Sequence, residues 1–197
     1  MRATVPRGAP PEGFVYAGGI LTAEEETTLL AELDGLRFDP IVLHGRPARR
    51  MARHYGLDYD YRARTPGPGE PIPEWLSWPR ARAAAFADVE PEQLVEILVQ
   101  RYPAGSTMGW HRDAPAFDIV VGLSLGAAAR LRFQRGKGEL REVWERVLEP
   151  RSGYVLAGPA RWSWQHSIPP AKERRYSITF RTLRTPSATG GSVSAVR

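Results

Sequence analysis

The spacing of hydrophobic residues near the start of the chain is that of a helix. Between residues 22 and 36 apolar side chains recur every three or four positions, with Leu29 and Leu33 in one row. Thr22 and Glu25 precede this row at the spacing of a capping box, in which each side chain bonds the other residue's backbone N–H. The pattern predicts a capped amphipathic helix over 22–36.

The segment that follows gives a different signal. Residues 65–79 are rich in proline and glycine, which predicts a loop over the surface, and a second helix is expected over 80–89. The two ends, 1–13 and 185–197, consist largely of small, polar, Pro and Gly residues and are expected to be loose. Neither a repeat nor a long Gly/Ser linker divides the chain, so 1–197 is interpreted as a single domain.

From residue 94 onward the apolar residues follow the shorter period of β-strands. In 129–135 alanine, leucine and phenylalanine alternate with polar residues, and Gly or Pro turns separate the runs. Two helices followed by short strands predict an α+β, mainly β fold, with an antiparallel β-sandwich or small barrel of the jelly-roll kind in the second half. The predicted strands cover 94–102, 119–125, 129–135, 143–148, 154–157 and 175–183.

Composition excludes several classes of protein. The 197 residues are 42% hydrophobic, 10% aromatic and 25% charged, which is typical of a globular domain and not of a disordered chain. No apolar run reaches the roughly 20 residues of a membrane helix, and the N-terminus lacks a signal-peptide core, so we expect a cytoplasmic protein without membrane contact. Because the chain has no cysteine, any metal must be bound by nitrogen and oxygen.

The positive charge comes almost entirely from arginine. The net charge is +5, and only two of the 27 basic residues are lysines. Arginine suits phosphate and carboxylate, which favours a nucleic-acid or diacid partner, but a GC-rich genome also enriches arginine without a functional reason. Residues 46–64 hold six arginines against two aspartates. A solvated charged face is the alternative explanation for this cluster.

Three residues have the spacing of a metal site. His111 and Asp113 form an H-x-D triplet whose side chains point to one face if the backbone is extended, and His166 follows 53 residues later. Two imidazoles and one carboxylate make the facial triad that leaves open positions on non-haem Fe(II). The triplet alone is a weak signal, since two histidines that only form hydrogen bonds in a core would give the same sequence.

A strand near the C-terminus adds a second feature. Along 175–181, alternation places Arg175, Ser177, Thr179 and Arg181 on one side. If the two arginines reach toward each other, roughly 6–8 Å remains between them, about the length of a five-carbon diacid. The spacing predicts a dicarboxylate clamp, with a solvent-facing charged strand as the alternative.

Together these motifs resemble the AlkB family of Fe(II)- and 2-oxoglutarate-dependent dioxygenases. The resemblance spans roughly 49–183 and rests on the order of H-x-D, a second histidine and two arginines six positions apart. It implies a double-stranded β-helix (jelly-roll) core with supporting N-terminal helices and a substrate lid. It also implies Fe(II), 2-oxoglutarate as cosubstrate, and O2. The segments that carry it are 99–113, 118–133, 152–168 and 175–181.

The resemblance also implies roles for the metal and cosubstrate residues. His111, Asp113 and His166 match the iron ligands. Arg175 matches the arginine that pairs with the distal carboxylate of 2-oxoglutarate, and Arg181 matches a catalytic-site arginine near the 1-carboxylate and the metal-bound aspartate.

Three further residues match cosubstrate positions. Tyr102 matches a tyrosine that hydrogen-bonds 2-oxoglutarate. Gln100 and Ser177 stand where family members have asparagine. The resemblance therefore implies that all three bind the cosubstrate.

Substrate contacts are expected from a lid over 44–79. The resemblance assigns base or phosphate contacts to Arg49, Arg50, Tyr55, Tyr59 and Tyr61. Leu57 stands where many relatives have an aromatic residue, and Ala114 and Pro115 replace a region that offers a second carboxylate in the repair members. His44 and His54 are not expected to be ligands.

The expected function is oxidative removal of alkyl groups from N-alkylated bases in single-stranded DNA or RNA by a monomeric enzyme, with release of aldehyde, succinate and CO2. Two alternatives stay open. One is the same oxidation on a protein or small-molecule substrate. The other is a nucleic-acid-binding module with a vestigial iron site.

Overall fold

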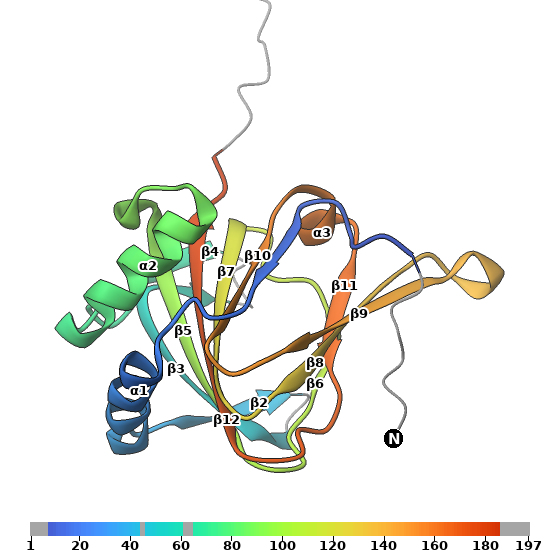
Figure 1. Cartoon of the computed structure of the whole chain (residues 1–197). Coiled ribbons are helices and arrows are strands. Elements are labelled where there is room, and N and C mark those ends of the chain that lie inside the picture. The colour runs from blue at the N-terminus through green and yellow to red at the C-terminus, as the bar shows by residue number, and fades with distance from the viewer. Residues whose placement is uncertain (1–7, 44–45, 61–64, 186–197) are drawn as a thin grey trace, which may run out of the picture.

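The structure, a computed structural model, describes residues 8–43, 46–60 and 65–185. Two antiparallel sheets face each other within this part of the chain, and two helices lie against the outer side of the larger sheet (Figure 1). The predicted mainly β, jelly-roll architecture with supporting helices is therefore confirmed.

The larger sheet has the strand order β1-β10-β7-β12-β5-β3-β2, and β4 pairs with β3 at one side. Its strands are β1 (Phe14–Ala17), β2 (Asp39–Leu43), β3 (Arg46–Asp60), β4 (Thr65–Pro68), β5 (Leu94–Tyr102), β7 (Phe117–Gly126), β10 (Ser152–Leu156) and β12 (Arg175–Leu183). The smaller sheet has the order β6-β11-β8-β9. Its strands are β6 (Met108–His111), β8 (Ala129–Arg135), β9 (Glu142–Leu148) and β11 (Gln165–Ile168).

The helices follow from local signals. Helix α1 (Ala23–Gly35) begins with the predicted capping box, since Glu25 N–H donates to Thr22 Oγ1 over 3.1 Å and Thr22 N–H donates to Glu25 over 2.8 Å. Helix α2 (Ser77–Ala87) begins three residues before the predicted start. Pro79 in its first turn is tolerated because a helix leaves its first N–H groups unpaired in any case.

The remaining helical elements are short. They are α3 (Gly158–Trp162) and the 3-10 turns η1 (Glu74–Leu76), η2 (Pro91–Gln93) and η3 (Gly138–Leu140). Among the described residues, no helix is long and apolar enough to cross a bilayer.

The segment 44–79, predicted as an irregular lid, is largely regular. Residues 46–56 of β3 belong to the larger sheet, where Met51 to Gly56 pair with β5, and the far end of β3 pairs with β4. The expectation of a loop over 65–79 was wrong at both ends, where β4 and the start of α2 lie. Strand β3 lacks clear apolar alternation and is stabilised by pairing with residues of β5 that lie 40 to 50 positions away in the sequence, which the local pattern does not reveal.

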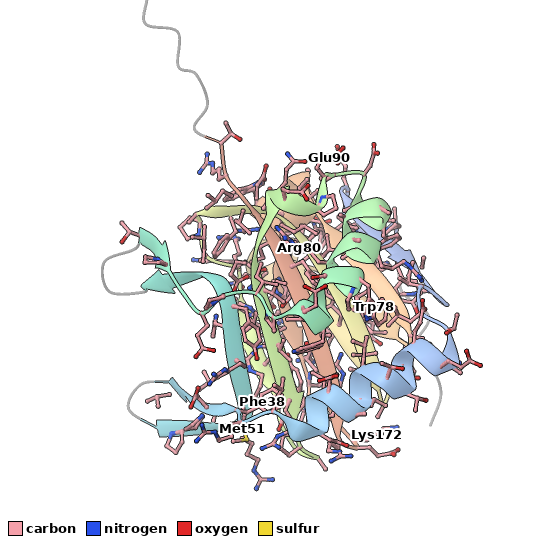
Figure 2. All side chains as sticks on the ribbon, turned by 90° about the vertical axis from the view of Figure 1, so that its left-hand side faces the viewer. Phe38, Met51, Trp78, Arg80, Glu90 and Lys172 are labelled. Carbon is pink, nitrogen blue, oxygen red and sulfur yellow. The ribbon has the colours of Figure 1, made fainter. Side chains whose placement is uncertain are left out.

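Alternation along the strands of the larger sheet separates two cores. On β12, Tyr176, Ile178 and Phe180 belong to the core beneath the helices. Figure 2 views this helix-covered side, with Trp78 of α2 labelled, and Trp78 packs against the same core. The side chains that alternate with these three, including Arg175 and Arg181, face the space between the sheets. The larger sheet thus has one apolar face and one buried face on which charged side chains lie among apolar ones such as Val120 and Leu156.

Candidate metal and cosubstrate site

The three predicted metal ligands come together between the sheets. His111 ends β6, Asp113 follows two residues later, and His166 lies on β11 directly opposite His111. One ligand atom from each residue lies within 4.8 Å of those of the other two. The predicted return of the second histidine on a neighbouring strand is therefore what the structure shows.

Hydrogen bonds orient the ring of His111. Its Nδ1 lies 2.9 Å from the carbonyl oxygen of Gly109. A proton on Nδ1 satisfies this contact and leaves the Nε2 lone pair for a metal ion, as is usual for histidine ligands. The ring centroids of His111 and His166 are 4.3 Å apart.

The site keeps its carboxylate ionised and its buried imidazole neutral. Burial acts to raise the pKa of Asp113, but the attraction of Arg181, with smaller contributions from the two histidines, holds it well below its usual range. Burial lowers the pKa of His166 to about 3, against the attraction of Asp113. Both residues are therefore in the protonation state that metal binding requires at neutral pH.

Arg181 binds two carboxylates of the chain itself. Its Nη2 donates to Asp113 Oδ1 over 2.8 Å, and its Nη1 donates to Glu96 over 2.6 Å. Burial acts to lower the pKa of Arg181, but Glu96 and Asp113 raise it above the ordinary value. The guanidinium is permanently charged and held in a fixed plane next to the triad.

Arg175 is buried in a very different way. It is 1% exposed, its Nη2 donates to Ser124 Oγ over 3.0 Å, and its Cζ lies 4.7 Å from the centre of the Tyr102 ring. Within the described part of the chain, its Nε and Nη1 are buried without a hydrogen-bond partner. A buried cation with two unused donors is costly unless an anion binds there. The site therefore fits the carboxylate of an acidic cosubstrate.

The two arginines of the predicted dicarboxylate clamp differ in their partners. Both face the interior, but Arg181 already binds Asp113 and Glu96, whereas Arg175 has donors to spare. The expectation treated the strand in isolation. The carboxylate that engages Arg181 comes from β5, opposite it in the sheet.

The other predicted cosubstrate residues lie beside Arg175. Tyr102 and Ser177 both donate to the amide oxygen of Gln100, at 2.9 Å and 3.5 Å. All three are buried, on neighbouring strands β5 and β12. The structure thus brings together all the residues predicted to bind metal and cosubstrate.

With this geometry established, a family comparison decides the class of protein. The model of the 2OG-Fe(II) oxygenase superfamily matches residues 13–181. The chain belongs to the 2OG-Fe(II) oxygenase superfamily. This membership confirms the predicted enzyme class, with Fe(II), 2-oxoglutarate and O2 as its cofactor, cosubstrate and co-reactant.

Individual relatives support the AlkB-type resemblance. An "Alkylated DNA repair protein ALKBH8 homolog" of Arabidopsis thaliana is 27% identical over 209 residues, covering 87% of this chain and 58% of that protein. "Uncharacterized protein L905" of Acanthamoeba polyphaga mimivirus is 33% identical over 109 residues, covering 49% of this chain and 50% of that protein. The chain spans about half the length of these curated relatives.

Solved structures share the fold. "The structure of OsALKBH1" superposes with a TM-score of 0.67 at 17% identity and covers 89% of this chain and all of that one. A prolyl-4-hydroxylase from Pseudomonas putida gives a TM-score of 0.59 at 17% identity, covering 87% of this chain and 93% of the other. At this identity the likeness concerns the fold of the oxygenase.

Sequence reasoning missed three residues that shape the oxygenase site. Glu96 binds Arg181. Tyr154 packs across Gly122, where an added Cβ would overlap its ring. Arg161 is buried and donates to two backbone carbonyls of the turn after Asp113, over 2.7 Å and 2.8 Å. Glu96 and Arg161 are charged residues within otherwise apolar segments, which is the signal that could have found them.

The tyrosine Tyr55, predicted to contact the substrate, does not lie near the triad. Tyr55 belongs to the core beneath the helices, opposite Ile97, so its expected role of stacking on a base was wrong. Its parity on β3 places it on the face away from the triad. Arg53, on that same face, donates to Glu70 over 2.6 Å.

Neighbouring arginines of the predicted lid point in different directions. Arg49 is exposed, whereas Arg50 is half-buried with its Cζ 5.8 Å from the centre of the Tyr102 ring. Arg50 therefore extends toward the cosubstrate residues. Tyr59 pairs with Pro66 in the β3–β4 ladder, and Tyr61 lies outside the described residues.

Proposed function

We propose that the chain oxidatively removes alkyl groups from N-alkylated bases of single-stranded nucleic acid, with His111, Asp113 and His166 as the iron ligands. The observation that carries this proposal is the match to a relative named as an alkylated-DNA repair protein along 87% of the chain. The triad and the buried, underused Arg175 support the same chemistry.

Within this proposal each buried residue has a task. When bound, Fe(II) and 2-oxoglutarate would supply the oxidising chemistry that inserts one oxygen atom of O2 into a C–H bond. The other oxygen atom enters succinate, and 2-oxoglutarate loses CO2. Arg175 binds the distal carboxylate, with Tyr102, Gln100 and Ser177 around it. Arg181 holds Asp113 in place.

Apolar side chains of the smaller sheet line one side of the site. Phe133 and Leu131 are fully buried, and Phe133 pairs with His166 across the sheet, with ring centroids 6.4 Å apart. Such side chains favour exclusion of water from the reaction. Hydroxylation of the alkyl carbon gives a carbinol whose C–N bond breaks. The hydroxyl proton is lost as the aldehyde forms, and the nitrogen regains an N–H.

The reaction itself is the first test. Metal-free protein is loaded anaerobically with Fe(II) and 2-oxoglutarate, exposed to O2 and offered a panel of methylated oligonucleotides, with aldehyde and succinate measured separately. We expect both products in equal amounts with at least one oligonucleotide. Succinate without aldehyde across the panel would contradict the nucleic-acid substrate and favour a protein or small-molecule substrate. Absence of both would contradict the enzyme and favour a binding module.

Arg49 offers a test of substrate binding. We expect it to contact phosphate, so Arg49→Gln should lower the slope of log affinity against log salt by about 0.7 for a single-stranded oligonucleotide. Arg141→Gln is the matched control, because Arg141 is exposed on the β8–β9 hairpin, which extends away from β3 and β4 (Figure 1). Equal slopes for both variants would remove Arg49 from the nucleic-acid surface.

A further inference from the structure

A buried carboxylate that the metal triad does not use lies next to it. Glu96 is 2% exposed and sits on β5 directly opposite Arg181 on β12 and Gly56 on β3. Its carboxylate accepts from Arg181 Nη1 over 2.6 Å and lies 3.4 Å from His54 Nδ1. A carboxylate is costly to bury, so its position calls for a reason beyond packing.

The contacts of Arg181 show how Glu96 reaches the triad. A guanidinium is planar, so a partner on one Nη fixes the direction of the other. Glu96 holds Nη1, and Nη2 then donates to Asp113 Oδ1. This leaves Asp113 Oδ2, 3.5 Å from His166 Nε2, as the oxygen turned toward the other two ligands.

Charge gives a second, independent argument. Between the sheets, Arg175 and Arg181 are balanced by Asp113 and Glu96, and nearby Arg161 has Asp118 as a counter-charge. A divalent ion and the 2-oxoglutarate dianion also cancel each other. The sum over these groups and the two ligands, which leaves out half-buried Arg50, is zero with Glu96 and one positive charge higher without it.

We propose that Glu96 is a positioning residue that orients Arg181 and, through it, the Asp113 ligand, and that its charge offsets Arg181 so that a divalent metal can bind. The network begins at the surface with His54, whose side chain is 39% exposed, and ends at the metal ligand. The proposal rests on the ligand set of the proposed function but not on its nucleic-acid substrate.

The test uses Mn(II) as the probe and the metal-free protein with all 197 residues. Glu96→Gln keeps the shape of the side chain and removes its charge. We expect Mn(II) to bind this variant about 10-fold more weakly by calorimetry. This is the lower end of the usual effect of losing a direct partner of a metal ligand, because Glu96 reaches Asp113 only through Arg181. We expect 2-oxoglutarate to bind the Mn(II)-saturated variant at least as tightly as wild type, because the site has gained positive charge.

The control is Glu92→Gln, the same chemical change at an exposed position four residues earlier. It should leave both affinities unchanged. Opposite effects on the cation and the dianion are the signature of the proposal, because a merely structural role would weaken both together. Parallel loss of both affinities in Glu96→Gln, or Mn(II) affinity equal to wild type, would overturn it.

A shorter carboxylate keeps the proposal testable if Glu96→Gln does not fold. Glu96→Asp retains the charge, so Mn(II) should bind only a few-fold more weakly than to wild type, whereas Glu92→Asp should have no effect. Equal Mn(II) affinities for wild type and Glu96→Asp would then overturn the positioning role. Mn(II) binding that survives His166→Ala would overturn the ligand set and, with it, the role of Glu96. If only the turnover of methylated oligonucleotides fails, the nucleic-acid substrate is wrong and the role of Glu96 stands.

Discussion

The two faces of the larger sheet differ in chemistry although the same strands build both. On β12, Ile178 and Phe180 pack under the helices, while Arg175, Thr179 and Arg181 alternate with them toward the smaller sheet. All five side chains are buried. The helix-side face gains stability from apolar burial, whereas the interior face holds charges that a stable core does not need.

This contrast shows where the oxygenase gives up stability for function. The helix-side core stabilises the fold by removing apolar area from water. The interior face contains Arg175 with two unused donors, and across from it β11 of the smaller sheet carries a neutral, buried histidine, His166; both residues weigh against folding until ligands bind. Substitutions beneath the helices should therefore lower the free energy of unfolding and leave ligand affinity unchanged. Substitutions in the interior should weaken ligand binding without a loss of stability.

The largest effect is expected at the metal ligands. His166→Ala leaves two ligands, which do not hold a labile divalent ion well, so Mn(II) affinity should fall by at least 100-fold. The metal-free variant should remain folded by circular dichroism. Wild-type affinity in a folded variant would show that His166 is not a ligand.

A substitution on the helix-side face should lower stability and leave metal binding unchanged. Ile178→Ala opens a cavity in the core beneath the helices and should lower the free energy of unfolding by about 2–5 kcal/mol, measured by denaturant titration. The folded variant should bind Mn(II) and 2-oxoglutarate as wild type does. A large loss of affinity would mean that the two faces are coupled.

Arg175→Met sharpens the comparison because it should separate binding from stability. Loss of charge-assisted bonds should weaken 2-oxoglutarate by about 10- to 100-fold, with Mn(II) affinity unchanged. The ligand-free variant should be as stable as wild type or more so, since a buried cation is replaced by an apolar chain of similar length. Marked destabilisation without loss of 2-oxoglutarate affinity would assign Arg175 to the scaffold.

The smallest effect concerns pH. Unfolded chains bind a proton on His166 below about 6.5, but the folded protein does not until about pH 3, so lowering the pH favours unfolding. Stability of the metal-free protein in EDTA should thus fall as pH drops from 6.5 to 5, by up to about 1.4 kcal/mol per pH unit from this residue. His166→Gln should make the slope shallower. An unchanged slope would mean that His166 titrates normally.

Much of this molecule is determined by the sequence alone. Helix α1 follows from its capping box and leucine row, and strands β5, β8 and β12 match their predicted limits because local alternation defines them. The H-x-D triplet, the second histidine and the paired arginines were recognisable because their chemistry depends on residue type and spacing.

The tertiary structure decided what those residues contact. Strand β3 depends on pairing with β5. The register of this pairing places Tyr55 in the core beneath the helices and points Arg50 toward Tyr102. The same sheet placed Glu96 opposite Arg181, so one arginine is paired within the chain while Arg175 keeps donors for a ligand. Side-chain alternation is a local property, but the partner across a strand is set by contacts between distant parts of the chain, and no local pattern specifies them.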